Sequence, residues 1–271
     1  MYNPAFAGKE NRANLALNHR QQWTGIEDAP VTSYISFDIP VESRVNLGTK
    51  LINEQRSIMN NTAVLLTLGY TAPFSQDNKH GLSFGISAGI MKQSIDKDGS
   101  YNYDDPAVIG LLDNRTHLLG EFGVRYRFYD LNIGLALPTL FSPYYASDHV
   151  QFDPLQEVLF MADYNFVISE KRVDFSPHFM YRLGNKHYTH FEVAGIFQFF
   201  DTFWTGAAFR QNYGTAALIG LNLGKDIRLG YAYEFATSKI SGVSNGSHEI
   251  QFLLGLGDPN KVKRLNPRYK H

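Results

Sequence analysis

Residues 81–92 read GLSFGISAGIMK, and the alternation in this stretch decides the fold class. Apolar side chains stand at every second position, namely Leu82, Phe84, Ile86, Ala88 and Ile90. Glycine and serine fill the positions between them. A period of two belongs to a β-strand, because successive side chains of a strand point to opposite faces. The stretch therefore predicts a strand with one apolar face and one face of very small side chains.

Residues 116–128 (THLLGEFGVRYRF) and 228–235 (RLGYAYEF) alternate in the same way, but their second face also carries Arg and Glu. The outer face of a soluble sandwich meets bulk water and would favour Lys, Thr and Glu over small residues. A face that combines small side chains with opposite charges suits a confined interior, where the charges neutralise one another. We therefore expect a closed barrel whose apolar face is turned to lipid.

The same rhythm continues along the chain and predicts about fourteen antiparallel strands of the length that crosses an outer membrane. The expected strands are 12–23, 30–39, 44–55, 61–73, 81–93, 115–128, 131–141, 157–169, 173–183, 188–200, 202–211, 213–223, 226–236 and 247–257. Short connections follow even-numbered strands, at 129–130, 170–172, 201 and 225–226. Long connections follow odd-numbered strands, at 94–114, 142–156 and 237–246. Outer-membrane barrels have short periplasmic turns and long external loops, and an even strand number returns both termini to the periplasm.

No linker or shift in composition divides the chain into domains. We therefore predict an all-β fold with a single transmembrane outer-membrane β-barrel over residues 1–257, preceded by a short N-terminal periplasmic segment. Residues 258–271 (DPNKVKRLNPRYKH) would form a basic C-terminal tail in the periplasm. Its cations would be either solvated or a contact for an acidic periplasmic partner. The candidates are Lys261, Lys263, Arg264 and Arg268.

Composition excludes several classes of function. A formal net charge of −1 and a pI near 6.8 argue against nucleic-acid binding, which needs a basic field or stripe. The chain contains no cysteine, which rules out disulfides, thiolate metal sites and cysteine nucleophiles. Residues 1–6 have neither the charged start nor the apolar core of a signal peptide. Either the chain stays in the cytoplasm, or its numbering begins after a signal peptide has been removed.

Motifs for catalysis or metal binding are weak. His178, His187 and His190 fall on different strands or loops, and no carboxylate stands beside them at ligand spacing, so we expect no metal and no cofactor. Ser247 and His248 are neighbours on a strand and therefore point to opposite faces, so we expect no catalytic residue. Outer-membrane phospholipases do place a Ser and a His on the outer wall of a barrel, and this enzyme alternative stays open.

Charged residues in the inward phase of the strands predict what the lumen contains. Eight of them share this phase: Glu121, Arg125, Arg127, Glu192, Arg210, Arg228, Glu234 and Glu249. They would form either a salt-bridged network that fills the interior or the lining of a selective pore. A barrel of about fourteen strands lies between the filled small barrels and the open porins, so its size does not decide between the two.

Two other regions are candidates for contacts at the external end. In the first strand, the phase places His19, Gln21 and Trp23 outward at the external interface, and Arg20 and Gln22 in the lumen. The two longest external loops carry tyrosines that suit protein recognition. These are Tyr101, Tyr103, Tyr144 and Tyr145.

Several motifs resemble those of a known family. They are YNPAFAG at 2–8, RQQW at 20–23 with Gly25 and Ala29–Pro30, FRQ at 209–211, RLGYAYEF at 228–235 and SHEI at 247–250. This pattern is similar to that of the PorP/SprF family of outer-membrane proteins of Bacteroidota, over essentially the whole chain. In that family the Asn-Pro-Ala segment follows a cleaved signal peptide.

The resemblance implies a function that periodicity alone does not. It implies a non-enzymatic barrel of the type IX secretion and gliding motility machinery, located in the cell outer membrane. Such a protein would support export or surface anchoring of a large adhesin through the C-terminal sorting domain of that adhesin. The implied partners are the adhesin, other secretion components, a periplasmic ring or peptidoglycan-binding protein, and outer-membrane lipid. The competing function is a channel for small solutes.

Overall fold

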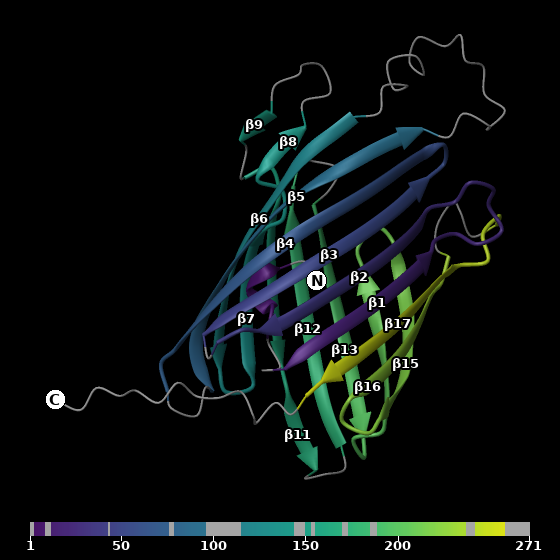
Figure 1. Cartoon of the computed structure of the whole chain (residues 1–271). Coiled ribbons are helices and arrows are strands. Elements are labelled where there is room, and N and C mark those ends of the chain that lie inside the picture. Colours follow the sequence, from purple (N-terminus) through teal and green to yellow (C-terminus); the bar gives the residue numbers. More distant parts are fainter. Residues whose placement is uncertain are drawn as a thin grey trace, which may run out of the picture.

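The computed structural model describes residues 3–8, 12–42, 44–75, 79–95, 115–143, 150–152, 155–169, 173–184, 189–236 and 242–257. It contains a short 3-10 helix and a series of strands (Figure 1). In chain order these are η1 Pro4–Phe6, β1 Ala13–Gln21, β2 Val31–Pro40, β3 Val45–Arg56, β4 Met59–Pro73, β5 His80–Ile95, β6 Arg115–Phe128, β7 Leu131–Leu137, β8 Phe141–Pro143, β9 Val150–Phe152, β10 Val158–Tyr164, β11 Phe166–Ser169, β12 Val173–Leu183, β13 His190–Phe199, β14 Phe203–Arg210, β15 Gly214–Leu223, β16 Ile227–Glu234 and β17 Ser247–Leu256. None of the helices in these ranges is long and apolar enough to cross a bilayer.

The strands close into a barrel, as the alternation predicted. Each strand of the main sheet pairs antiparallel with its neighbours, and β1 pairs with β17. The ring closes because β10 pairs with both β7 and β12. Within the described residues, the main sheet has fifteen strands. β10 and β11 are two halves of one strand that is interrupted at Asn165, which makes fourteen crossings. The small β8–β9 hairpin stands apart from this sheet.

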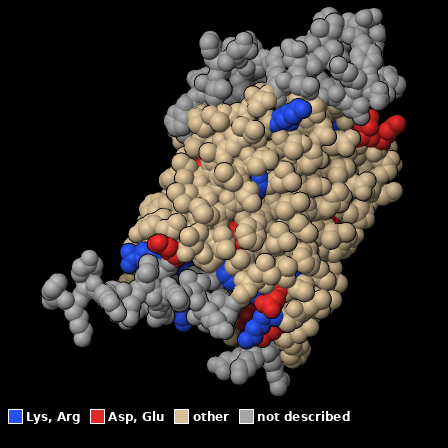
Figure 2. Space-filling view, in the orientation of Figure 1, with Lys and Arg blue, Asp and Glu red and all other residues tan. Residues whose placement is uncertain are grey.

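The inside and outside of the wall follow the predicted phase. On β5, Phe84, Ile86 and Ile90 are 38%, 52% and 55% exposed, whereas Ser83 and Ser87 are 7% and 1% exposed. The apolar side chains therefore form the outer surface, where lipid covers them in an outer-membrane barrel. Figure 2 shows few charged side chains across the middle of the visible face, with most of them near the two ends.

Some boundaries differ from the sequence prediction. The first strand ends at Gln21 and not at residue 23, because Trp23 adopts a positive φ of 46° and the chain leaves the pleat. The alternation of the strand therefore does not extend to Trp23. The seventh strand ends at Leu137 rather than at residue 141. The turns between β3 and β4 and between β14 and β15 are also short, although they lie at the end of the barrel where β5 ends and β6 begins. Connection length therefore separates the two ends less strictly than expected.

Residues 3–8 lie inside the barrel, whereas the sequence predicts a short N-terminal segment in the periplasm. Asn3 and Ala5 are 1% and 3% exposed, and η1 contacts β4, β5 and β6. Figure 1 shows this end of the chain within the barrel, about halfway along it. The segment fits there because the facing wall is lined by glycines, as described below. The predicted basic tail, residues 258–271, lies outside the described residues.

Candidate functional site

A row of very small residues crosses the inner wall. Gly69 on β4, Gly85 on β5, Gly123 on β6 and Ala136 on β7 stand opposite one another in the strand register. A Cβ at Gly85 would overlap the backbone of Pro4, and a Cβ at Gly123 would overlap the side chain of Asn3. The missing side chains therefore leave a groove in the wall, and residues 3–8 occupy it.

Asn3 holds the N-terminal segment to the wall. Its Nδ2 donates to the backbone oxygens of Val124 on β6 at 3.1 Å and of Leu135 on β7 at 3.2 Å. Its Oδ1 accepts from the backbone N–H of Ala5 at 2.9 Å, which caps η1. A single buried amide thus fixes the short helix and ties it to two strands.

The other end of the segment is tied to β2. The backbone N–H of Gly8 donates to Oδ2 of Asp38 at 2.9 Å, and Nδ2 of Asn14 donates to the same oxygen at 3.3 Å. Asp38 is 8% exposed, so its carboxylate is held inside the barrel. Between the two ends, the guanidinium of Arg125 lies over the ring of Phe6, with its carbon 4.8 Å from the ring centroid.

A charge cluster crosses the inner wall from β13 to β1. Arg210 donates through Nε to Glu192 at 2.6 Å and through Nη1 to Glu234 at 3.3 Å. Arg20 donates through Nη2 to Glu234 at 2.9 Å and through Nη1 to Glu249 at 3.1 Å. Glu234 therefore joins the two arginines. The cluster holds three carboxylates and two guanidinium groups, a formal charge of −1.

The other predicted lumen charges do not join this cluster. Glu121 pairs with Lys50, and Arg125 donates to Asn132, whose Nδ2 donates to Asp163 at 2.8 Å. Arg127 donates to the backbone oxygen of its neighbour Tyr129. Arg228 donates to Asn222 at 3.0 Å in an exposed position near a periplasmic turn.

Sequence reasoning missed several of these partners. Three of them lie in the inward phase of their strands, namely Lys50, Asp38 and Asp163. This phase was the sequence signal that could have placed them in the lumen. Lys50 and Glu121 are 71 positions apart, and Asn132 and Asp163 are 31 apart. Pairs of this kind become visible only when the register of the whole barrel is known.

A cavity of about 400 Å³ lies inside the barrel, between the charge cluster and η1. The charge cluster forms the charged side of the cavity. Phe6 of the N-terminal segment and Met161 of β10 also line the cavity. Its remaining wall is largely apolar, with Ala194, Ile196, Ala208, Leu218 and Ala232 among the lining residues. The interior is thus partly filled by the chain itself and partly open.

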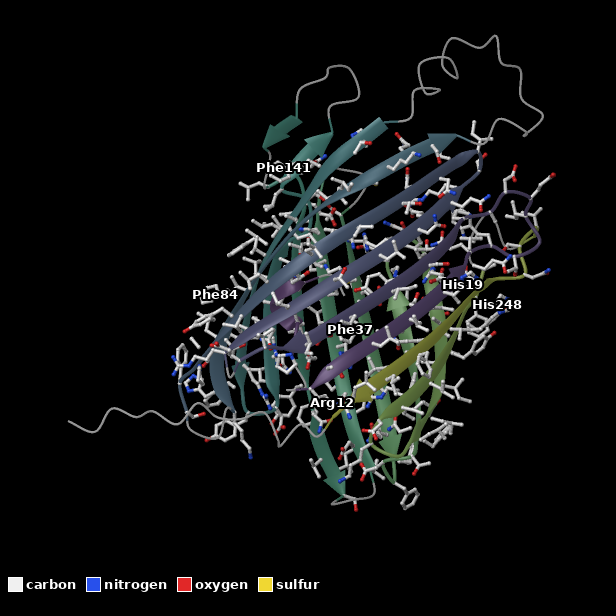
Figure 3. The ribbon with its side chains drawn as sticks, in the orientation of Figure 1. Arg12, His19, Phe37, Phe84, Phe141 and His248 are labelled. Carbon is white, nitrogen blue, oxygen red and sulfur yellow. The ribbon has the colours of Figure 1, made fainter. Side chains whose placement is uncertain are left out.

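Ser247 and His248, which the enzyme alternative would pair, have other partners in the structure. Ser247 is 3% exposed and its Oγ accepts from the backbone N–H of Trp23 at 3.2 Å. Nδ1 of His248 lies 2.7 Å from the hydroxyl of Tyr231, whose ring belongs to the outward phase. A different contact, between Nδ1 of His19 and Oγ of Ser33 at 3.0 Å, joins β1 and β2 in the outward phase. Figure 3 shows His19 and His248 near the external end of neighbouring strands.

Other predicted residues give no site that the structure can describe. Within the described ranges, no group of three or more His, Cys, Asp or Glu is arranged to hold a metal ion. His187, the loop tyrosines and the basic tail lie outside these ranges. The predicted contact residues in these loops and in the tail are Tyr101, Tyr103, Tyr144, Tyr145, Lys261, Lys263, Arg264 and Arg268.

Solved structures resemble this barrel in fold. Omp33 of Acinetobacter baumannii aligns with a TM-score of 0.51 at 6% identity, over 90% of this chain and 98% of that one. CdiB of the same species aligns with a TM-score of 0.47 at 10% identity, over 90% of this chain and 60% of that one. The KdgM porin aligns with a TM-score of 0.41 at 10% identity, over 90% and 99% of the two chains. At such identities the likeness to Omp33 shows the fold alone.

Sequence comparison supplies the family. No curated protein sequence matches this chain. The family model described as type IX secretion system membrane protein PorP/SprF matches residues 1–253, nearly the whole chain, and includes the N-terminal segment in the lumen. The chain therefore belongs to the PorP/SprF family of type IX secretion system membrane proteins, and its barrel lies in the cell outer membrane.

Proposed function

We propose that this barrel is a non-enzymatic component of type IX secretion and gliding motility that supports export or surface anchoring of a large adhesin. The observation that carries the proposal is the partly filled interior of a barrel from a secretion family. The N-terminal segment and the paired charges lie in the lumen. A barrel of this kind offers surfaces to partners rather than a wide passage.

The adhesin would bind through its C-terminal sorting domain at the external loops. Tyr101, Tyr103, Tyr144 and Tyr145 suit this role, because tyrosine gives large contact area and a polar tip at protein interfaces. At the other end, the basic tail would meet a periplasmic ring or peptidoglycan-binding protein. Other secretion components and outer-membrane lipid complete the proposed set of partners.

A pull-down from intact outer membrane tests the proposal. The tagged barrel should recover an adhesin that ends in a sorting domain, and replacement of Tyr101 and Tyr103 by Ala should reduce that recovery. Replacement of Tyr129, which is 53% exposed beside a periplasmic turn, is the matched control and should leave recovery unchanged. Absence of any such adhesin from the wild-type pull-down would overturn the proposal.

The cavity of about 400 Å³ favours one second candidate, a channel for small solutes. Its charged side could select ions, as rings of charge do in channels. Conductance in planar bilayers separates the two functions. A large steady current through the wild-type barrel would favour the channel.

A further inference from the structure

We propose that the row of small residues formed by Gly69, Gly85, Gly123 and Ala136, here called the glycine row, is a peptide-binding groove. Residues 3–8 occupy this groove as a separable plug, and the plug closes the barrel to ions and small solutes. The ligand class is a short peptide that carries Asn-Pro-Ala. The inference goes beyond adhesin anchoring, because it concerns the inside of the barrel and holds whichever partner binds outside.

The groove is shaped for a peptide backbone. Gly85 has a glycine at the paired position on both neighbouring strands, Gly69 and Gly123, and Ala136 continues the row. The atoms that a Cβ at Gly85 would meet are backbone atoms of Pro4 and Ala5. A backbone cannot swing aside as the end of a long side chain can, so one methyl group is enough to unseat the segment.

The polar contacts are also specific to this peptide. Asn3 supplies two donors to wall carbonyls and one acceptor to its own helix, a combination that a carboxylate or hydroxyl cannot reproduce. Asp38 accepts from the N–H of Gly8 at the other end. Pro4 starts the helix without needing a partner for an N–H. The wall therefore binds both ends of the Asn-Pro-Ala segment through specific hydrogen bonds.

The wall does not need the plug for its own backbone hydrogen bonds. The register from β3 to β7 runs unbroken past the groove, and the segment adds no strand to the sheet. Its described backbone–backbone hydrogen bonds, from Phe6 to Asn3 and from Ala7 to Pro4, are local. A barrel that lacks the segment can therefore keep its fold, which makes the plug separable.

The position of the plug explains its effect on passage. Phe6 lines the cavity of about 400 Å³, so η1 stands between that space and the wall of β4, β5 and β6. Removal of the segment would join the empty groove to the cavity. The barrel would then contain one wider passage beside the charge cluster.

Single-channel conductance in planar bilayers tests the proposal. The full chain should conduct weakly, and a chain that lacks residues 1–8 should conduct several-fold more. Gly85→Ala and Asn3→Ala should raise conductance in the same direction. Gly48→Ala is the matched control, because it also faces the lumen but a Cβ there meets its neighbours at 3.4 Å, in ordinary contact. A synthetic peptide MYNPAFAG added to the truncated barrel should lower its conductance again, and a scrambled peptide should not.

Folding is checked separately by heat-dependent migration on gels and protease resistance. A folded truncated barrel with the conductance of the full chain would overturn the proposal, and so would equal block by the scrambled peptide. If truncation prevents folding, unchanged conductance of both Gly85→Ala and Asn3→Ala overturns it instead. Adhesin recovery by the same variants reports on the anchoring function alone, so the two proposals can fail independently.

Discussion

Arg20→Met should destabilise the barrel more than any change of an exposed charge, and the structure gives the size of the effect. Arg20 donates to Glu234 and Glu249, and the side chains of Arg20 and Glu234 are 14% and 11% exposed. Without Arg20, Glu234 keeps the longer contact from Arg210, and Glu249 keeps a hydrogen bond from Asn18 at 2.7 Å. The formal charge of the cluster falls from −1 to −2. Removal of one partner from a buried ion pair costs about 3–5 kcal/mol, and the partial exposure of Glu249 favours the lower end.

Glu234→Gln should have a smaller effect. Both arginines keep one carboxylate partner, and the amide oxygen of Gln can still accept a hydrogen bond, so the expected cost is about 1 kcal/mol. In the double variant, which combines Arg20→Met with Glu234→Gln, the cluster retains Glu192, Glu249 and Arg210. Its formal charge is again −1. Its loss of stability should therefore be smaller than the sum of the two single losses by about 1–2 kcal/mol.

Equilibrium unfolding in urea, with the barrel in lipid vesicles, measures these differences. Trp204 is 9% exposed and its fluorescence reports the loss of the folded interior. Arg228→Met is the matched control, because that arginine is exposed at the periplasmic end, and it should cost less than about 0.5 kcal/mol. A loss for Arg20→Met no larger than this control, or strict additivity in the double variant, would refute the reasoning.

Three further predictions follow from other parts of the barrel. Ile86→Lys places a charge on the lipid-facing side of β5 and should lower the free energy of unfolding by about 2–4 kcal/mol near the middle of the bilayer, as measured by the same unfolding assay. A similar loss of stability for Ile86→Val would contradict a lipid-facing position. Lys50→Met leaves Glu121 buried without its partner and should cost about 3 kcal/mol, and Lys50→Met with Glu121→Gln should recover most of that loss. Ser33→Ala and Ser247→Ala should each leave phospholipid hydrolysis by the purified barrel at the background level of the wild type, and a serine-dependent activity would show that the barrel is an enzyme.

The strands were predictable because their alternation is a local property. On β5 the lipid-facing and lumen-facing side chains differ so strongly that the phase can be read from the sequence without any partner strand. The main barrel strands were expected at nearly their observed positions for this reason. Trp23 was an exception, because nothing in its neighbours signals the positive φ that ends the first strand.

The contents of the lumen were less predictable, since they depend on register. Glu192 and Arg210 are direct cross-strand partners, and their inward phase was enough to suggest a charge network. Lys50 and Glu121 meet from β3 and β6, two strands that are not neighbours in the sheet. The N-terminal segment is harder still, because a 3-10 helix of three residues has no periodicity to read.

The glycines of β5 show what register adds to a sequence pattern. Gly81, Gly85 and Gly89 look alike in the alternation, and all three predict a confined inner face. Their cross-strand partners separate them: Gly81 faces Pro73 and Arg127, and Gly89 faces Leu65 and Leu119. Gly85 alone of the three has glycine on both sides, and it is the one that meets the backbone of the N-terminal segment. A glycine at each of several paired positions leaves a groove that one isolated glycine cannot, because neighbouring side chains would fill the space. In a barrel wall such a row therefore predicts a backbone seated against it.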